Sequence, residues 1–328
     1  MTDVKVSILI PVYNREQYIA ECIYSVLNQT YKRIEVIVVD NLSEDSTWDI
    51  CKKIQADDDR VRLFRNKSNV GPVRNWIACL DEAKGDYAKI LWSDDLIDKE
   101  FLSRTIPYLE RNEDVGFVFT KTKRFDDSGW SEETYDIGPE GIYATKQYID
   151  DVLFVETYPV SPGCAVFRTR DLRKNLLLNI PNKVNSDFSM HAIGNDLLMF
   201  LLTAHEYKKF AYVNKSLSSF RAHENSISVQ SQHDGKLTLH YMLAKAYFVE
   251  SYLNNSKYIK RLNTKIWLLL ILFSKNKYGL EKVSDFYIDN RNYGISYIEL
   301  LKKILDKKIF IKVLSLLKRR LSVRLNAD

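Results

Sequence analysis

Two adjacent carboxylates, Asp94 and Asp95, follow a strand-like stretch with the sequence YAKILW, from which only Ser93 separates them. Like charges placed side by side repel each other, so a strand that delivers two of them to one point suggests a cation beside them. A divalent metal ion that carries a phosphate is the obvious candidate. A simpler reading stays open, because aspartate is common in turns and at helix starts, and Asp98, Lys99 and Glu100 resemble the first turn of a helix.

Other polar or turn-forming residues stand where three earlier strand-like segments end. They are Pro11, Tyr13 and Asn14 after the first segment, Asp40, Asn41 and Ser43 after the second, and Asn66 and Asn69 after the third. Parallel sheets bind ligands in the crevice beyond the C-terminal ends of their strands. Polar groups therefore gather on the one edge where a nucleotide would lie.

The elements that must position these residues alternate between strand and helix over the first 120 residues. Apolar, often β-branched runs predict strands at 4–12, 34–39, 61–64, 87–92 and 115–120, and helical spacing predicts helices at 17–29, 46–55, 73–83 and 99–112. Repeated βαβ units imply a largely parallel sheet with helices on both faces. We therefore predict an α/β, Rossmann-like fold.

The alternation weakens between residues 126 and 158, where glycines mark loops that would suit an insertion on the acceptor side. Further on, the pattern predicts strands at 163–167 and 210–213 and an apolar helix at 196–204. After His223 long helical segments follow, at 236–253, 259–273 and 297–318. We predict a catalytic domain over residues 1–232 and a C-terminal helical region over 233–328.

The composition is that of an ordinary globular protein, with 45% hydrophobic and 28% charged residues. Its four cysteines are widely spaced without a CxxC pair, which indicates neither a zinc site nor a disulfide framework. The longest apolar run, at 266–273, covers less than half of the roughly 20 residues that span a bilayer. The N-terminal apolar run is too short for a signal peptide core, so we expect a cytoplasmic protein.

The C-terminal 28 residues, 301–328, carry nine basic and two acidic residues, a net charge of +7 against +5 for the whole chain. Apolar residues at helical spacing between these lysines and arginines suit a helix on an anionic membrane surface, at the inner face of the cell membrane. A helix packed on the catalytic domain or at a homo-oligomer interface is the open alternative. Nucleic-acid binding is not indicated, because the tail lacks interleaved aromatic readers.

Four stretches in this order resemble the family 2 glycosyltransferases of GT-A fold: VSILIPVYNREQYIAECIYSVLNQTY, IEVIVVDNLSEDST, NVGPVRNWIACLDEAKGDY and ILWSDDLI. The resemblance is strong over residues 4–125, moderate over 160–230, and does not reach the C-terminal helices. It implies an inverting, metal-dependent enzyme that moves a sugar from a nucleotide-sugar donor. The acceptor would be a hydroxyl of a glycan or lipid-linked glycan, in bacterial surface polysaccharide synthesis.

The resemblance also assigns a nucleotide site. Asp40 would pair with the base, since a carboxylate can accept the ring N–H of uracil or thymine, which implies a UDP- or dTDP-sugar in preference to a GDP-sugar. Asn69, Gly71 and Arg74 match a segment that wraps the base and ribose. The donor site is completed by Pro11, Tyr13, Asn14 and Ser93. For Asp40 a strand-end turn role stays open, and for Arg74 that of a solvated helix arginine.

Asp94 and Asp95 match the last two acids of the family's metal motif, Asp-x-Asp-Asp, and Trp92 stands where the first acid is usual. Mg²⁺ or Mn²⁺ would be held there with the donor's diphosphate. The segment FRAHENSIS resembles one with an Arg-x-His near the diphosphate. His223 would ligate the metal or donate to a phosphate, with Arg221 as an anion partner. A purely structural histidine is the alternative.

An inverting transfer needs a base that takes the proton of the acceptor hydroxyl. The family places this carboxylate in a Glu-Asp pair at a helix start, which matches Asp196, with Asn195 in place of the glutamate. Helix capping is the alternative role for Asp196, and Asp187 is the competing acid nearby.

Three other functions have different sequence requirements. A sugar nucleotidyltransferase would show a glycine-rich basic loop after its first strand, and PVYNREQYI contains no glycine. A dehydrogenase is disfavoured because the GxGxxG fingerprint is absent. A catalytically silent nucleotide-sugar-binding or scaffold protein stays open because of Trp92 and Asn195.

Overall fold

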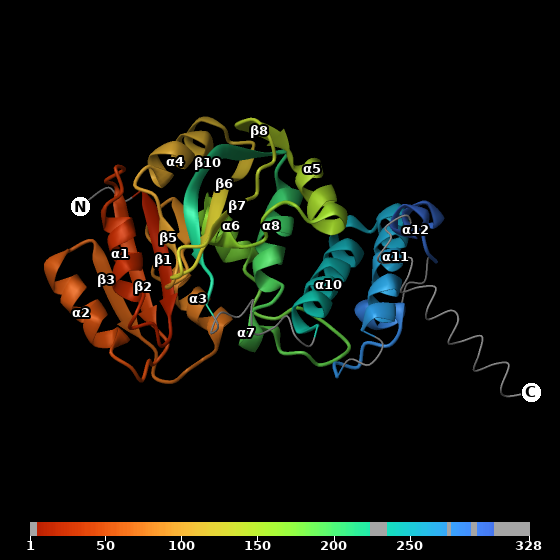
Figure 1. The fold of residues 1–328 in the computed structure, drawn as a ribbon, viewed down its shortest axis with the longest axis horizontal. Helices are drawn as coiled ribbons and strands as arrows, with labels where there is room; N and C mark the ends of the chain where they lie inside the picture. Colours follow the sequence, from red (N-terminus) through yellow and green to blue (C-terminus); the bar gives the residue numbers. More distant parts are fainter. Residues whose placement is uncertain (1–4, 224–234, 274–276, 290–293, 305–328) are drawn as a thin grey trace, which may run out of the picture. The chain divides into compact units, whose positions relative to one another are not determined.

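The computed structural model describes residues 5–223, 235–273, 277–289 and 294–304 (Figure 1). The chain divides into two compact units, one of Met1–Ile180 with Asp187–Ala244 and one of Pro181–Ser186 with Lys245–Asp328. Helix α10 (Lys236–Phe248) runs through the point where the main chain passes from the first unit to the second. The domain division predicted near residue 232 stays a proposal.

The first unit is built on a ten-stranded sheet of order β3-β2-β1-β4-β9-β6-β10-β5, in which β7 also pairs with β6 and β8 with β10. The strands are β1 (Val6–Val12), β2 (Ile34–Asp40), β3 (Val61–Arg65), β4 (Tyr87–Ile90), β5 (Leu96–Ile97), β6 (Val115–Phe125), β7 (Ser131–Thr134), β8 (Gly141–Ala144), β9 (Ala165–Arg168) and β10 (Lys209–Arg221).

Strands β3, β2, β1 and β4 are mutually parallel, as predicted, with β1 and β2 in register from Val6 opposite Ile34 to Val12 opposite Asp40. Strand β9 is antiparallel to both β4 and β6, and β10 is parallel to β6. Strand β10 therefore ends at the same edge as β1, β2 and β4. This topology brings Arg221 and His223 to the edge that carries the acid pair.

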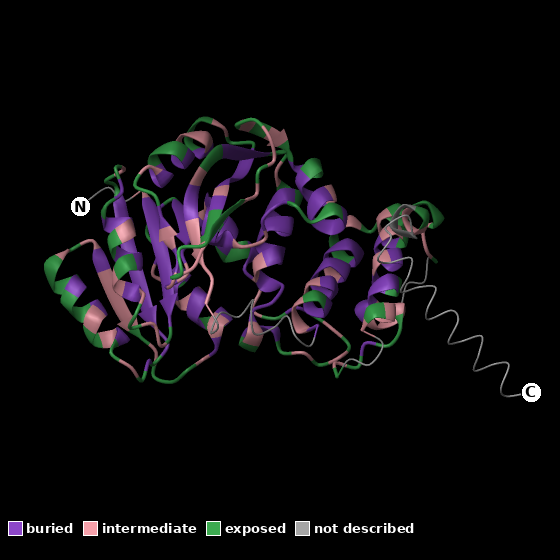
Figure 2. Ribbon diagram, viewed as in Figure 1, coloured by how far each residue is buried: buried purple, intermediate pink, exposed green. Residues whose placement is uncertain are grey.

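Helices cover both faces of the sheet (Figure 1). Every residue of β1 and β2 is therefore buried (Figure 2). Val6, Ile8 and Ile10 share one core cluster with residues of α1 (Ile19–Leu27) and α4 (Phe101–Arg111). Side chains alternate across a strand, so the equally buried Leu9 points to the opposite face, where α3 (Pro72–Asp81) contacts β1. The predicted α/β class is confirmed.

The remaining helices of the first unit are α2 (Thr47–Asp57), α5 (Thr145–Asp150), α6 (Thr169–Asn175), α7 (Phe188–His191) and α8 (Asn195–Glu206), with a π turn at Asp151–Val155 and a 3-10 turn at Pro162–Cys164. The segment predicted as loops, 126–158, thus contains β7, β8 and α5. Short exposed strands such as β7, with the sequence SEET, have no apolar run that would have marked them.

The second unit is helical, as predicted for the C-terminal region. It contains a π turn at Val249–Leu253, helix α11 (Ser256–Leu272), a 3-10 turn at Val283–Phe286 and helix α12 (Tyr297–Ile304). The predicted helix at 297–318 is therefore described only in its first part, and residues 305–328 lie outside the described residues. Among the helices described, none has the length and apolar character that crossing a bilayer requires.

Candidate active site

The acid pair lies on the loop after β4, and Asp94 faces two cationic or metal-ligating side chains. His223 Nε2 lies 2.7 Å from Asp94 Oδ2, and Arg15 Nε lies 3.5 Å from the same oxygen. The structure therefore brings together Asp94 and His223, as predicted. Arg15 was not predicted, although its position directly after the polar residues that end β1 could have indicated it.

Asp95 is in a different environment from its neighbour. Its side chain is buried, and Oδ1 accepts a hydrogen bond from the Arg221 backbone N–H at 2.9 Å. Burial, and then the adjacent Asp94 charge, raise the pKa of Asp95 well above its usual range. Burial also opposes ionisation of Asp94, but His223 and Arg15 outweigh it and hold the pKa of Asp94 below its ordinary value. The different surroundings of the two acids thus shift their pKa values in opposite directions.

The residues present fit a metal ion that is held partly by the protein and partly by the phosphate oxygens of a bound nucleotide. Among the described residues, no three or more His, Cys, Asp or Glu side chains converge as a ready-made metal cluster. Asp94 Oδ2 and His223 Nε2 do converge on one point, whereas the Asp95 carboxyl is engaged by the Arg221 backbone. Mg²⁺ and Mn²⁺ at nucleotide sites commonly take one or two protein ligands and complete their shell with phosphate oxygens and water. A two-ligand site suits that chemistry.

Arg221 is held firmly within the site. Its side chain is only 7% exposed, and its two terminal nitrogens donate to Glu21 at 2.6 Å and Asp127 at 2.5 Å. The guanidinium also lies 4.9 Å from the centre of the Tyr18 ring and 4.6 Å from that of Phe125. Arg221 thereby ties the end of β10 to α1 and to the turn after β6. Its predicted contact with a diphosphate stays a prediction.

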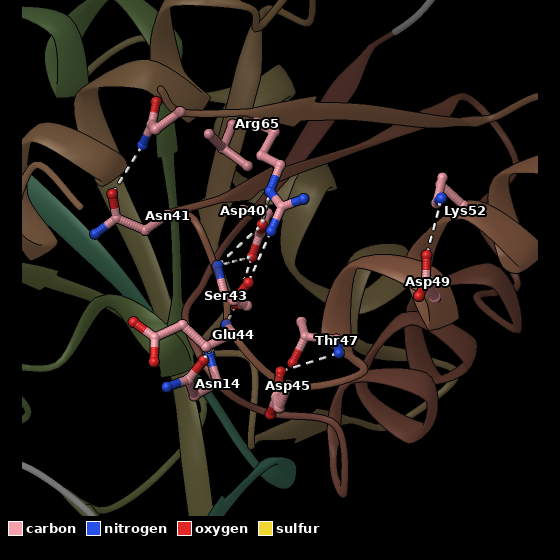
Figure 3. Close-up of polar contacts among 12 residues, drawn as sticks. Asn14, Asp40, Asn41, Ser43, Glu44, Asp45, Thr47, Asp49, Lys52 and Arg65 are labelled. Carbon is pink, nitrogen blue, oxygen red and sulfur yellow. Dashed lines mark hydrogen bonds and ion pairs between the residues drawn. The ribbon is translucent and has the colours of Figure 1, made fainter. Parts of the chain in front are cut away.

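The nucleotide end of the predicted site is centred on Asp40, the last residue of β2 (Figure 3). Its carboxylate is fully buried and accepts hydrogen bonds from the Ser43 N–H and hydroxyl. It also forms an ion pair with Arg65, whose Nε lies 2.9 Å from Oδ2. Asn14, which has a φ of 50°, joins the same turn, because its N–H donates to Ser43 Oγ and its Oδ1 accepts from the Glu44 N–H. The turn role that the sequence left open for Asp40 is therefore present. Its pairing with a base stays a prediction.

The segment after β3 carries Asn69 and Gly71, which contact each other, and Arg74, which contacts α7. Asn69 Oδ1 accepts from Asn41 Nδ2 at 2.8 Å and from the Gly71 N–H at 3.1 Å. Gly71 has a φ of +83°, which favours glycine. Arg74 is exposed, but its Nη1 donates to Ser189 Oγ at 2.7 Å and so links α3 to α7.

Three further predicted donor residues differ in exposure. Pro11 is buried within β1 opposite Val39, Ser93 is 7% exposed, and Tyr13 is 37% exposed beyond the end of β1. Tyr13 is thus the most accessible of the three to a ligand at this edge.

Asp196 lies in the first turn of α8, where its two carboxylate oxygens have different partners. Oδ1 accepts from the N–H groups of Gly194 at 3.0 Å and Leu197 at 2.8 Å, and Oδ2 accepts from the Tyr241 hydroxyl at 2.7 Å. Burial raises the pKa of Asp196 to about 6, and these hydrogen bonds partly offset the rise. A carboxylate with a pKa near 6 is mostly ionised at neutral pH and is suited to accept a proton.

Asn195 and Trp92 stand where the sequence resemblance leads one to expect acids, and both make packing or structural contacts. Asn195 is buried and donates to the Leu177 carbonyl at 2.7 Å, and its Oδ1 has no hydrogen-bond partner among the described residues. Trp92 lies 4.8 Å from Trp76 between ring centres, and its Nε1 donates to Ser161 Oγ at 3.0 Å.

The competing acid, Asp187, is exposed and serves as the N-cap of α7. Its Oδ1 accepts from the Ser189 N–H at 3.0 Å and from the Ser189 hydroxyl at 2.6 Å. The hydrogen bond from the Ser189 side chain outweighs partial burial and holds the pKa of Asp187 below its usual value. A carboxyl with a lowered pKa is a weaker base than Asp196.

The fold is an α/β arrangement whose parallel strands end at one edge with clustered polar side chains. The model of the family described as glycosyl transferase family 2 matches residues 7–176, just over half of the chain. The chain belongs to this family.

Similar proteins include two curated relatives from Streptococcus pneumoniae serotype 4. Glycosyltransferase GlyG is 32% identical over 123 residues, which cover 38% of this chain and 40% of GlyG. Glycosyltransferase GlyA is 27% identical over 242 residues, which cover 70% of this chain and 32% of GlyA. The chain thus spans less than half the length of these two relatives.

Among solved structures, S. aureus TarS in complex with UDP-GlcNAc superposes with a TM-score of 0.62 at 18% identity, over 84% of this chain and 74% of that one. A second TarS crystal structure gives a TM-score of 0.59 at 18% identity, over 84% of this chain and 44% of that one. This likeness concerns the fold, and it confirms the predicted GT-A arrangement.

Proposed function

We propose that this protein is a metal-dependent, inverting glycosyltransferase. It would move a sugar from a nucleotide-sugar donor to a hydroxyl of a glycan or lipid-linked glycan acceptor. The observation that carries the proposal is that Asp94 and His223, two potential metal ligands, converge at 2.7 Å on the C-terminal edge of the sheet. Family membership supports the same reading, since the two curated relatives described above are named glycosyltransferases.

Each part of the site would contribute a separate function. Asp94 and His223 would hold Mg²⁺ or Mn²⁺, which when bound offsets the negative charge that develops on the leaving diphosphate. Arg15, which already lies 3.5 Å from Asp94, would add a cation on the same side. Asp196 would accept the proton of the acceptor hydroxyl as its oxygen attacks the anomeric carbon from the face opposite the diphosphate.

The donor is proposed to be a UDP- or dTDP-sugar. Asp40 closes the strand next to β1, and its carboxylate would have to exchange part of its contact with Ser43 or Arg65 for the ring N–H of the base. The complex of TarS with UDP-GlcNAc supports a uridine nucleotide as the first to test. Synthesis of a bacterial surface polysaccharide is the process to which we assign the reaction.

A donor screen tests the proposal. Release of UDP or dTDP from UDP-GlcNAc, UDP-glucose, UDP-galactose and dTDP-glucose is measured with Mn²⁺, with Mg²⁺ and with EDTA. We expect metal-dependent release with at least one donor and its loss in Asp94→Ala. The matched control is Asp59→Ala, an exposed acid before β3 at the opposite edge of the sheet, which should keep the wild-type rate. Donor binding without release by any donor, with or without metal, would favour a catalytically silent binding protein.

We also propose that the C-terminal region binds an anionic membrane surface. Helix α12 exposes Tyr297, Ile298 and Leu301, which are 75%, 69% and 63% accessible and lie on one helical face. The basic residues that follow provide the opposite charge for acidic headgroups. Co-sedimentation with phosphatidylglycerol vesicles should be lost in a chain that ends at residue 296, and equal sedimentation of both chains would contradict this proposal.

A further inference from the structure

A tyrosine from outside the predicted catalytic domain contacts the proposed base. Tyr241 lies on α10, beyond residue 232, and its hydroxyl donates to Asp196 Oδ2 at 2.7 Å. Both residues belong to the first compact unit. Helix α10 therefore delivers a side chain to a carboxylate that starts a helix 45 residues earlier.

The Tyr241 hydroxyl is well placed to fix the orientation of the Asp196 carboxylate. Oδ1 is held by two backbone N–H groups of its own helix turn, Gly194 and Leu197. Oδ2 is held by the phenol from a second helix, so the plane of the carboxylate is defined at both ends. A carboxylate oxygen can accept more than one hydrogen bond, so Oδ2 retains a lone pair for an incoming hydroxyl proton.

Among the described residues, three tyrosines interact electrostatically with Asp196. Tyr241 lies on α10, Tyr135 in the segment between β7 and β8, and Tyr148 on α5. Burial, followed by the proximity of Asp196, keeps the pKa of Tyr241 well above its usual range. Tyr241 therefore stays a neutral donor at every pH at which the enzyme would work. A neutral donor stabilises the ionised form of a carboxyl.

We propose that Tyr241 is a positioning residue for the proposed base: its hydroxyl orients the Asp196 carboxylate and stabilises the ionised form that accepts the acceptor proton. This inference rests on the proposed function of Asp196 in catalysis. The hydrogen bond itself can also be tested without any assumption about the reaction.

The kinetic test is Tyr241→Phe, which removes one oxygen and keeps the ring. With the donor that is most active in the screen above, the acid limb of the kcat profile should move up by about one pH unit, because loss of the donor favours the protonated carboxyl. At each pH on the acid side, kcat of the variant should be roughly tenfold lower than that of the wild type. At pH 9 it should approach the wild-type value, and KM for the donor should be unchanged. The matched control is Tyr247→Phe on the same helix, which should leave the profile in place.

The activity-independent test is the titration of the Asp196 carboxyl by ¹³C NMR in protein labelled at aspartate. Its resonance is assigned as the one that disappears in Asp196→Asn, and thermal melts verify that each variant is folded. We expect the midpoint to be higher in Tyr241→Phe than in the wild type and in Tyr247→Phe.

The outcomes separate the two hypotheses. An unchanged Asp196 midpoint in folded Tyr241→Phe overturns the role of Tyr241, whatever the enzyme does. A raised midpoint with an unshifted kcat profile would overturn the proposed base, because ionisation of Asp196 would then not set the acid limb, and with it the catalytic part of the role of Tyr241. Full activity of Asp196→Asn would also overturn the proposed base while leaving the Tyr241 hydrogen bond intact.

Discussion

His223 Nε2 lies 2.7 Å from Asp94 Oδ2, although the two residues are 129 positions apart in the chain. The contact depends on β10, which lies parallel to β6 and so ends at the edge reached by the loop after β4. The His223 ring also packs against Tyr18, with 5.3 Å between ring centres. The proposed metal ligands are therefore oriented by packing before any ligand arrives.

Replacement of His223 by alanine should weaken metal binding. The variant loses one of two convergent ligands, so we expect Mn²⁺ affinity in the presence of UDP to fall by roughly 10–100-fold, measured by electron paramagnetic resonance titration. His205→Ala, an exposed histidine in the last turn of α8, is the matched control. Equal Mn²⁺ affinities of His223→Ala and wild type would remove His223 from the metal site.

Replacement of Asp196 by asparagine should remove turnover and spare donor binding. An amide has the shape of the carboxylate but cannot take a proton, so we expect kcat to fall roughly 10²–10⁴-fold. UDP affinity, measured by calorimetry, should stay within about twofold of the wild type. Asp187→Asn separates the two candidate acids, and if that variant showed the larger loss, the base would be Asp187.

The pH dependence of the wild-type enzyme should follow the Asp196 carboxyl. Its pKa is raised by burial to about 6, and the ionised form is the active one. We therefore expect kcat to level off above about pH 7 and to fall about tenfold per pH unit below pH 6. A profile that stays flat down to pH 4.5, in a protein shown to be folded there, would contradict a base with this pKa.

Lys89 is a fully buried lysine in β4, the strand that precedes the acid pair. Its Nζ donates to the Gly163 carbonyl and lies 4.2 Å from the centre of the Phe101 ring. Burial lowers the pKa of Lys89 to about 7 from 10.5. Between these values the unfolded chain binds more protons than the folded one, so this residue makes the free energy of unfolding rise with pH from about 7 to 10.5.

Lys89→Met should remove that rise. Urea unfolding of both proteins is measured at pH 6, 7.5 and 9. The free energy of unfolding of the wild type, relative to that of the variant, should increase with pH by at most a few kcal/mol. Lys84→Met, an exposed lysine near the start of β4, should give the same difference from wild type at each pH. A difference for Lys89→Met that does not change with pH would mean that Lys89 keeps its proton in both states.

Gly71→Ala should destabilise the fold mainly through the backbone. The residue has a φ of +83° and a ψ of 163°, a region that is close to exclusive to glycine, and the strain costs about 1–3 kcal/mol. An added Cβ would also lie 2.6 Å from Met190 Sδ, an atom of a flexible, half-exposed side chain. Met190→Ala should therefore rescue only part of the loss in the double variant, as measured by urea unfolding, and full rescue would show that the clash dominates.

The sequence predicted the parallel half of the sheet because the apolar runs of β1 and β2 are continuous, and these strands carry the predicted polar edge. It could not predict that β9 enters the sheet antiparallel between β4 and β6, since strand order depends on tertiary packing. The position of β10 follows from that insertion. Local sequence patterns therefore could not predict the contact between His223 and Asp94.

The same limit applies to individual site residues. Asp94 and Asp95 look equivalent in sequence, yet only Asp94 faces His223, because the Arg221 backbone N–H engages Asp95. Arg221 looked like an anion partner, but two carboxylates already engage it. Tyr241 carries no local signal at all, since the chain must fold before α10 reaches Asp196.

The packing of Trp92 on Trp76 gives the site a built-in optical reporter. The two indoles lie 4.8 Å apart, and Trp92 stands two residues before Asp94. Indole emission changes with the charge and polarity around the ring, so a nucleotide that reaches Asp94 should alter the fluorescence of the unlabelled protein. The residue that departs from the family's usual acid thus makes donor association measurable in a stopped-flow fluorimeter.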